Sequence, residues 1–507
     1  MGGGLMQLVA YGAQDVYLTG NPQITFWKVT YRRHTNFAME SIEQTFNGQA
    51  DFGRRVTCTI SRNGDLAYRT YLQVTLPQID SKAGDINPEM RWLDFPGEQL
   101  ISQVEVEIGG QRIDRQYGDW MHIWNQLTLS KEQERGYYKM VGQTTQLTYL
   151  TNEAYADVGT ACDAVSNQVC HPRKSLPETT LYVPLQFWYC RNPGLALPLI
   201  ALQYHEVKIN LDLRPIDECL FAVTGTTPAK NTDAYINSIV AASLYVDYVF
   251  LDTDERRRMA QNPHEYLIEQ LQFTGDESIT SNSNKIKLNF NHPCKELVWV
   301  VQNDDIVNYC EQYDSGDGAQ PFNYTDMRDA LLNSYEAFTD VDAISSATSA
   351  FTVGDFGAVE TSTGGGSHVN EIVNLQKAAG GDALAFVAAE TALDMHCWGE
   401  NPVVTAKLQL NGQDRFSERE GTYFDLVQPY QFHTRSPDTG INVYSFALRP
   451  EEHQPSGTCN FSRIDNATLQ LVVSSEAVKG SAKVRVYATN YNVLRVMSGM
   501  GGLAYSN

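Results

Sequence analysis

Few residues of this chain have the types and spacing that metal chemistry requires. Histidine and cysteine, the usual zinc ligands, lie near one another at Cys162, Cys170 and His171, and again at His292 and Cys294. Neither group has the paired C-x-x-C spacing of a familiar zinc site, so we expect His292 and Cys294 to be loop or core residues. The sequence predicts no metal and no cofactor.

Motifs for nucleotide binding and hydrolysis are absent as well. The glycine-rich run from Gly364 to His368 lacks the Gly-Lys-Ser/Thr ending whose lysine and hydroxyl hold phosphate and metal. The chain has neither Gly-x-Ser-x-Gly nor His-Glu-x-x-His. Asp304 and Asp305 could serve acid–base chemistry, but adjacent carboxylates in a loop are usually solvated. With no catalytic constellation, the sequence predicts that the protein is not an enzyme.

One modification remains to consider. Glycosylation sequons occur at Asn323, Asn460 and Asn466, although the start of the chain has no secretory signal. Asn323 is the one candidate glycosylation site, because it lies in a segment that we expect to be a surface insertion.

Charge and cysteine usage exclude several classes of protein. The formal charge of −22 argues against a broad phosphate-binding surface, so we expect no direct contact with a genome. Short basic runs occur at Arg32-Arg33-His34, Arg54-Arg55 and Arg256-Arg257-Arg258, and solvated faces and salt bridges usually explain such runs. Nine scattered cysteines do not form a disulfide framework, which favours free thiols in a reducing cytosol. No apolar run has the length of a membrane-spanning helix.

The elements that carry these residues are β-strands, and one hairpin pattern occurs twice. Val106 to Gln111 runs through Gly-Gly to Gly118-Asp-Trp, and Leu408 to Gln413 runs through Asn-Gly to Gly421-Thr-Tyr. Gly-Gly and Asn-Gly accept the positive φ angles of a tight hairpin turn. The repeat, offset by about 300 residues, predicts an all-β chain built from two tandem sandwiches.

Turn-punctuated strands define the expected domains. We predict a strand at 24–31, and a hairpin between 56–60 and 66–76 around the turn Asn63-Gly64. Four tryptophans could anchor either interfaces or the cores, and the cores are the favoured position: Trp27, Trp120, Trp124 and Trp188. The divisions are an N-terminal arm (1–24), a first sandwich (25–251) with a loop excursion at about 130–180, a linker helix (252–263), and a second sandwich (264–507) with a surface insertion at about 303–398 and a C-terminal tail.

Several stretches resemble one protein family. The segment from Gln14 to Trp27, followed by Tyr31 to Phe37, resembles the start of major capsid proteins of nucleocytoplasmic large DNA viruses. Further matching stretches are 195–205, 252–261, 419–424, 444–450 and 460–465. The resemblance covers residues 5 to about 503 and weakens in 130–180 and 303–398.

The resemblance implies a double jelly roll, two eight-stranded antiparallel sandwiches side by side. It implies a homotrimer that forms a pseudo-hexagonal capsomer, contacts neighbouring capsomers and tiles the icosahedral shell of a large double-stranded DNA virus. Minor capsid and penton proteins and an internal lipid membrane are the implied partners. The implied location is the outer shell of a virion assembled in the host cytoplasm, with 303–398 facing outward and 1–24 inward. The alternative is a jelly-roll protein that binds a glycan or receptor without catalysis.

Overall fold

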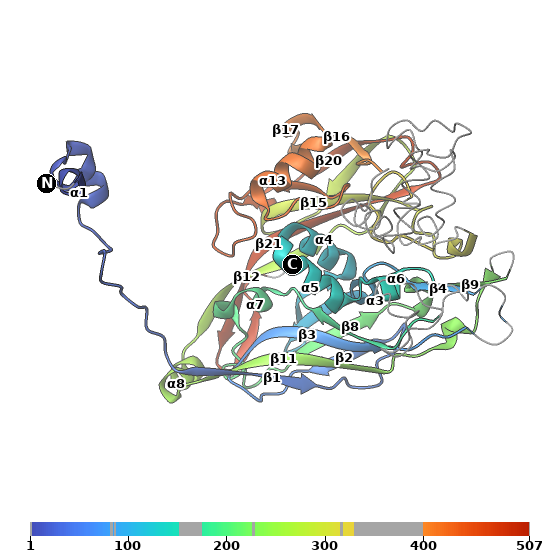
Figure 1. Cartoon of the computed structure of the whole chain (residues 1–507), viewed down its shortest axis with the longest axis horizontal. Coiled ribbons are helices and arrows are strands. Elements are labelled where there is room, and N and C mark those ends of the chain that lie inside the picture. The colour runs from blue at the N-terminus through green and yellow to red at the C-terminus, as the bar shows by residue number, and fades with distance from the viewer. Residues whose placement is uncertain are drawn as a thin grey trace, which may run out of the picture.

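The computed structural model describes residues 3–81, 85, 88–151, 175–225, 229–314, 318–328 and 399–505. Two β-sandwiches lie side by side, the N-terminal one in blue and green and the C-terminal one in orange and red (Figure 1). Antiparallel pairing runs throughout both, so the predicted all-β fold is confirmed.

The first sandwich, which we call roll 1, has two four-stranded sheets. One sheet has the order β1-β11-β3-β7, and the facing sheet has the order β2-β8-β5-β6. Their apolar faces enclose one core, because alternate residues such as Leu72, Val74 and Leu76 point inward. The strands are β1 (Phe37–Gln44), β2 (Arg55–Thr59), β3 (Leu66–Leu76), β5 (Ile101–Ile108), β6 (Gln111–Tyr117), β7 (Thr179–Pro184), β8 (Val207–Leu213) and β11 (Ala241–Leu251).

The second sandwich, roll 2, repeats this plan. Its sheets have the orders β12-β21-β15-β18 and β14-β20-β16-β17, which match those of roll 1 position by position. Each roll therefore has the eight strands of a jelly roll. The strands are β12 (His264–Phe273), β14 (Ser283–Leu288), β15 (Pro293–Asn303), β16 (Val403–Leu410), β17 (Gln413–Glu420), β18 (Asn442–Ser445), β20 (Ala467–Val473) and β21 (Ala482–Met497); β13 (Glu277–Ile279), β19 (Cys459–Asn460) and β22 (Met500–Leu503) attach to β21 or β15.

The sequence repeat occupies equivalent places in the two rolls. Gly109 and Gly110 join β5 to β6 with φ of 58° and 84°, and Asn411 and Gly412 join β16 to β17 with φ of 50° and 81°. Positive φ at both central residues is the type I′ geometry that these dipeptides favour. The predicted hairpin repeat is therefore present in the fold.

A glycine follows each hairpin, Gly118 in roll 1 and Gly421 in roll 2, and both are required for the same steric reason. A Cβ on Gly118 would lie 2.2 Å from the carbonyl oxygen of Ile101, and a Cβ on Gly421 would lie 1.8 Å from that of Val403. Ile101 and Val403 are the first residues of the equivalent strands β5 and β16. Each roll thus brings two backbone segments so close together that only glycine fits.

Two local predictions are wrong. The segments 56–60 and 66–76 do not pair with each other, because β2 pairs with β8 and β3 pairs with β11 in the facing sheet. The Asn63-Gly64 turn is a sandwich corner, and the buried carboxylate of Asp65 fixes it by accepting from the Leu251 amide at 2.9 Å and from Arg256 at 2.8 Å.

The strand predicted at 24–31 is not formed, and the arm is longer than predicted. Residues 20–36 have no strand, and β1 begins only at Phe37, opposite the last residue of β11, Leu251. No strand of the described chain pairs with the residues before Phe37. The arm contains the short helices α1 (Gly3–Val9), η1 (Ala13–Asp15) and α2 (Val16–Thr19).

Helices replace the first part of the predicted loop excursion. α5 (Lys131–Val141) and α6 (Thr145–Thr148) lie within it, after α4 (Gly118–Thr128), and residues 152–174 of the excursion lie outside the described structure. Helix α5 was not predicted because it is mostly polar, with only Tyr137 and Val141 buried. Much of the predicted insertion, 329–398, also lies outside the described residues.

The predicted linker helix is present as α8 (Thr253–Gln261) and ends before Pro263. Its N-cap is Asp252, whose carboxylate accepts a hydrogen bond from the Thr253 amide at 2.8 Å. No helix in the described part is both long and apolar enough to cross a bilayer. The remaining elements are α3 (Pro96–Leu100), α7 (Trp188–Arg191), α13 (Gln428–Phe432), a small sheet of β4 (Glu89–Trp92), β9 (Leu220–Thr224) and β10 (Ala229–Lys230), the π-helix η6 (Tyr423–Val427), and 3-10 turns η2 (Pro193–Leu195), η3 (Ile216–Glu218), η4 (Ala234–Ile236), η5 (Gln312–Asp314) and η7 (Phe461–Arg463).

Candidate assembly surfaces

A third apolar core joins the two rolls. Helices α4 and α5 of roll 1 lie between the rolls (Figure 1) and pack on the outer face of the β12-β21-β15-β18 sheet. Strand β15 is buried on both faces: Leu297, Trp299 and Val301 belong to the core of roll 2, while Val298 and Val300 contact the helices. This contiguous core makes the two rolls one body.

Aromatic rings form the centre of this junction. The rings of Trp120 and Tyr487 are 5.3 Å apart, those of Tyr487 and Phe273 are 4.8 Å apart, and those of Phe273 and Tyr117 are 5.1 Å apart. The chain of rings runs from α4 and β6 of roll 1 to β21 and β12 of roll 2, and each such pair adds stabilisation beyond its buried area.

Charged side chains also cross the junction. Asp119, in the first turn of α4, accepts from Arg485 of β21 at 3.0 Å and forms an ion pair with Arg214 at 3.4 Å. Asp119, Arg485 and Arg214 are all more than four-fifths buried, so losing one partner would leave a charge that water solvates poorly.

A second network surrounds Glu269 of β12. Its carboxylate pairs with Lys295 at 2.8 Å, Arg191 of α7 at 3.0 Å and His453 at 3.2 Å. Burial raises the pKa of Glu269, but the hydrogen bond from His453 and the positive charges of Lys295 and Arg191 outweigh it and lower the pKa to about 2. The guanidinium of Arg191 also lies 4.0 Å from the ring centroid of Trp124, so this network ties α7 and α4 to roll 2.

A third network holds the segment after α13. His433 lies between Glu296 at 2.9 Å and Glu451 at 3.0 Å, with its side chain fully buried. Burial lowers the pKa of His433, but the two carboxylates outweigh it and raise the pKa to about 9. Arg435, two residues after His433, forms an ion pair with Glu134 of α5 at 2.8 Å and adds another charged contact between the rolls.

Sequence reasoning missed these junction networks. Asp119, Arg485, Glu269 and Lys295 each stand as a charged residue within or beside an apolar stretch, and that is the one signal that could have found them.

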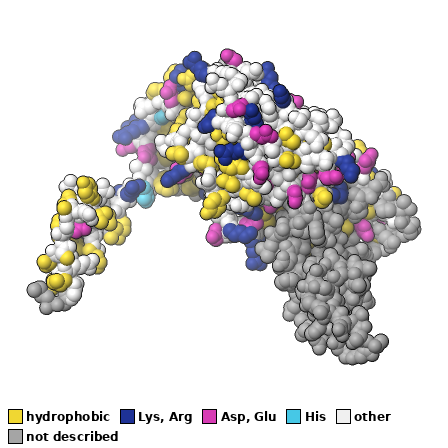
Figure 2. Space-filling model, turned by 90° about the horizontal axis from the view of Figure 1, so that it is seen from above, with side chains coloured by type: hydrophobic (Ala, Val, Ile, Leu, Met, Phe, Trp, Pro, Cys, Tyr) yellow, Lys and Arg dark blue, Asp and Glu magenta, His cyan; other side chains and the backbone are white. Residues whose placement is uncertain are grey.

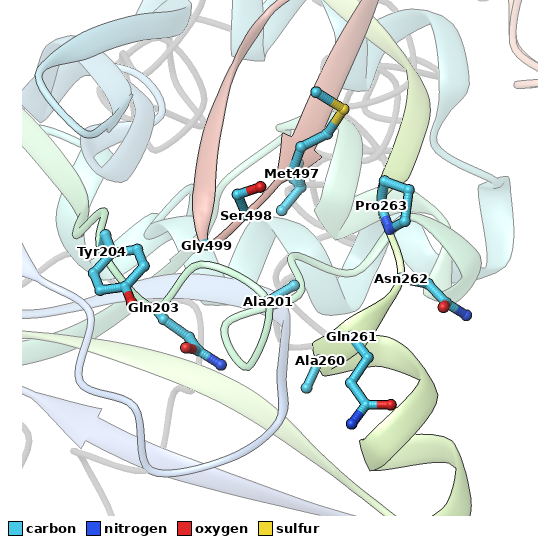
Figure 3. Close-up of a pocket in the computed structure, with 11 residues that line it drawn as sticks. Ala201, Gln203, Tyr204, Ala260, Gln261, Asn262, Pro263, Met497, Ser498 and Gly499 are labelled. Atoms are coloured by element: carbon cyan, nitrogen blue, oxygen red, sulfur yellow. The ribbon is translucent and has the colours of Figure 1, made fainter.

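One described cavity lies where roll 1, α8 and roll 2 meet. This cavity, of about 490 Å³, opens between α8 and the β21–β22 turn. Figure 3 shows it bordered by Tyr204, Met497, Ser498 and the end of α8, without a cluster of ionisable side chains. Within the described residues no group of three or more His, Cys, Asp or Glu could hold a metal ion.

The residues that the sequence singled out for chemistry are dispersed. Cys294 is fully buried in the core of roll 2, and His292 is buried directly before β15, as expected for loop or core residues. Asp304 contacts the Ser481 hydroxyl and lies 3.5 Å from Lys483. The described cysteines are free thiols. Cys162, Cys170, His171 and the run 364–368 lie outside the described residues.

The sequon at Asn323 occupies a buried position. Asn323 is 2% exposed, its Nδ2 donates to Gln320 at 2.8 Å and to the carbonyl of Met327 at 3.0 Å, and its Oδ1 accepts from Thr325. Glycosylation there stays a prediction, and it would require attachment before this segment folds. The sequon residues Asn460 and Asn466 are exposed.

The N-terminal arm is exposed along its length. No residue of its helices is buried, and Trp27 is 82% exposed, which contradicts the core position expected for it; Trp120, Trp124 and Trp188 are buried as predicted. Figure 2 shows the arm as a separate lobe bearing hydrophobic side chains, joined to the body by a narrow neck.

Comparisons with known proteins agree with this architecture. The family model for the major capsid protein N-terminus matches residues 25–252, and the model for the large eukaryotic DNA virus major capsid protein matches 255–502. The chain is 74% identical to the major capsid protein of Phaeocystis pouchetii virus and 42% identical to that of Paramecium bursaria Chlorella virus 1, over the full length of all three chains.

Solved structures extend the match to the fold. A chain of the PBCV-1 virus capsid is 36% identical, superimposes with a TM-score of 0.61 and covers 95% of this chain and 100% of its own. The Faustovirus major capsid protein is 12% identical with a TM-score of 0.65, covering 96% of this chain and 94% of its own, which shows a shared fold. With matches over both rolls, the chain belongs to the major capsid proteins of large eukaryotic DNA viruses and is a structural subunit of the virion capsid.

Proposed function

We propose that the protein forms homotrimers whose six jelly rolls make a pseudo-hexagonal capsomer, and that these capsomers tile the icosahedral outer shell of a large double-stranded DNA virus. The observation that carries the proposal is the matched strand order of the two rolls. Two equivalent sandwiches per chain give a trimer nearly sixfold symmetry, which a hexagonal lattice requires.

The junction between the rolls supports the same proposal. A capsomer keeps its outline only if the angle between the two sandwiches of each subunit is fixed. The ring contacts between α4 and β21 and the ion pair between Asp119 and Arg485 supply that rigidity. Flat sandwich sides then meet in the permanent trimer interface, for which about 2,000 to 5,000 Å² is typical.

The proposed partners follow from position in the shell. Each trimer contacts neighbouring capsomers, minor capsid proteins and penton proteins, and the shell overlies an internal lipid membrane. Assembly takes place in the host cytoplasm. Direct genome binding is not part of the proposal, because the chain carries a formal charge of −22.

The mass of the purified protein in solution tests the trimer. Light scattering coupled to size exclusion should give about three times the subunit mass of 56.8 kDa, and negative-stain images should show a hexagonal outline. A monodisperse monomer would contradict the proposal and favour the alternative, a jelly roll that binds a glycan or receptor.

Protease digestion of intact particles tests the orientation. We propose that segment 303–398 faces outward and residues 1–24 face inward. External protease should therefore cleave the insertion and spare the arm, and cleavage of the arm alone would refute the orientation.

A further inference from the structure

The arm has a charge opposite to that of the rest of the protein. Between Asp15 and Glu40 the chain has no acidic residue but has Lys28, Arg32 and Arg33, with His34 beside them. Residues 16–39 thus carry +3 in a chain of −22, so the remaining residues carry −25. All four basic side chains are exposed.

The same segment exposes large apolar side chains. Phe26 is 103% exposed, Trp27 82%, Tyr17 91% and Leu18 84%, although such residues are normally covered. The other exposed apolar residues of this segment are Val16, Ile24, Val29, Tyr31, Phe37 and Met39.

The fold adds further guanidinium groups at the base of the arm. Because Phe37 pairs with Leu251, the arm and α8 leave the sheet at the same end, and Figure 1 shows α8 beside the foot of the arm. Arg257 and Arg258 of α8 are exposed there, although Asp254 and Glu255 on the same helix balance them. Figure 2 shows Lys, Arg and His side chains gathered at the neck.

We infer that residues 16–39 form a docking segment for an anionic lipid surface. Aromatic and aliphatic side chains enter the boundary between headgroups and acyl chains, while lysine and arginine remain at the anionic headgroups. The segment 20–36 has no regular secondary structure with which to present a shaped protein interface, and a bilayer requires none. Leu18, Ile24 and Val29 do not stack on bases, so the composition fits lipid better than single-stranded nucleic acid.

This inference rests on the proposed function, which places a bilayer beneath the shell. Three arms per trimer would bind one bilayer together, so modest affinity per arm would add up to firm attachment. The body of the protein, with its strongly negative charge, would stay away from the same surface.

Vesicle flotation of the purified full-length protein tests the inference. Vesicles of phosphatidylcholine with phosphatidylserine should carry the protein upward, and vesicles of phosphatidylcholine alone should carry much less. Each cation near an anionic surface strengthens binding about fivefold, so the triple variant Lys28→Ser, Arg32→Ser, Arg33→Ser should bind about a hundredfold more weakly. The variant Phe26→Ser, Trp27→Ser should lose at least about tenfold.

A matched control removes the same charge from the body. The variant Lys131→Ser, Arg449→Ser, Lys479→Ser also changes the formal charge from −22 to −25, and those side chains are 76%, 71% and 77% exposed. It should float like the wild type. Because the arm substitutions affect no buried residue, all variants should fold and keep the oligomeric mass of the wild type.

Three results would overturn the inference: no flotation of the wild type with anionic vesicles, equal flotation of the arm variants and the control, or arm-dependent binding of single-stranded DNA without vesicle binding. Light scattering of the same preparations separates this inference from the trimer. A monomer that floats through its arm refutes only the proposed function, and a trimer that does not float refutes only the lipid inference.

Discussion

Replacing Gly421 by alanine should destabilise roll 2 strongly. The new Cβ would lie 1.8 Å from the carbonyl oxygen of Val403 and 2.9 Å from its carbonyl carbon. Both are backbone atoms at the start of β16, a strand paired with β17 and β20, so no side-chain rotation can relieve the contact.

The magnitude follows from this geometry. The two segments must separate by about 1.5 Å to reach van der Waals contact. Overpacking that side chains can absorb costs about 1 to 3 kcal/mol, and a displacement of paired backbone belongs at the upper end, about 3 kcal/mol. At roughly 2 to 4 °C per kcal/mol for a domain of this size, the melting temperature of roll 2 should fall by about 6 to 12 °C.

Differential scanning calorimetry of the purified protein measures this shift. Gly118→Ala is the equivalent test in roll 1, because its Cβ would lie 2.2 Å from the carbonyl oxygen of Ile101. Gly136→Ala is the matched control, since Gly136 lies within α5 and a Cβ there meets nothing within 4 Å. Alanine favours a helix over glycine, so this variant should gain up to about 1 kcal/mol.

The reasoning would be refuted if Gly421→Ala melted at the temperature of the wild type. The repeated Gly-x-aromatic pattern would then reflect something other than the close approach of two backbone segments. A drop of the same size in Gly136→Ala would show instead that any change of glycine disturbs this protein.

Three further outcomes are expected. The pKa of His433 is raised from 6.5 to about 9, so the stabilisation from its charge is fully present below about pH 6.5 and is lost as the pH rises through 9. Hydrogen exchange of the segment around His433 should lose about 3 kcal/mol of protection over that range. The variant His433→Gln should show no such pH dependence, and the same flat profile in the wild type would contradict the prediction. Asp119→Ala leaves Arg485 without one partner and should cost about 3 kcal/mol, seen as faster exchange in α4 and β21, whereas Asp414→Ala, at a surface pair with Lys407, should change nothing measurable. Brief trypsin treatment of the free protein should cut the exposed arm at its basic residues, seen by mass spectrometry as loss of the N-terminal peptides, and resistance of the arm would contradict its exposure.

The hairpin repeat was the most productive local signal. Gly-Gly at 109–110 and Asn-Gly at 411–412 predict their turns because positive φ is a property of those residues themselves. The turn Asn63-Gly64 has the same hairpin signal but lies at a sandwich corner, where the chain crosses from one sheet to the other. Asp65 holds this corner by accepting from the Leu251 amide, so β2 pairs with β8 and not with β3. Local turn chemistry indicates that a chain reverses direction, but not which strand it then meets.

The strand predicted at 24–31 failed for a related reason. Its residues have high β propensity, yet β11 ends at Leu251 and leaves them without a partner in the described chain. Helix α5 was missed because its polar side chains face solvent and only Tyr137 and Val141 are buried.

The sequence by itself determined the two-roll plan, the hairpin turns, the linker helix and the absence of a catalytic motif, because these depend on residue types at short spacing. Only the tertiary structure decided that Asp119 meets Arg485 and that Glu269 collects Lys295 and Arg191. Those partners are brought together by packing α4 and α7 of one roll on the sheet of the other, and no local pattern encodes contacts between side chains so far apart along the chain.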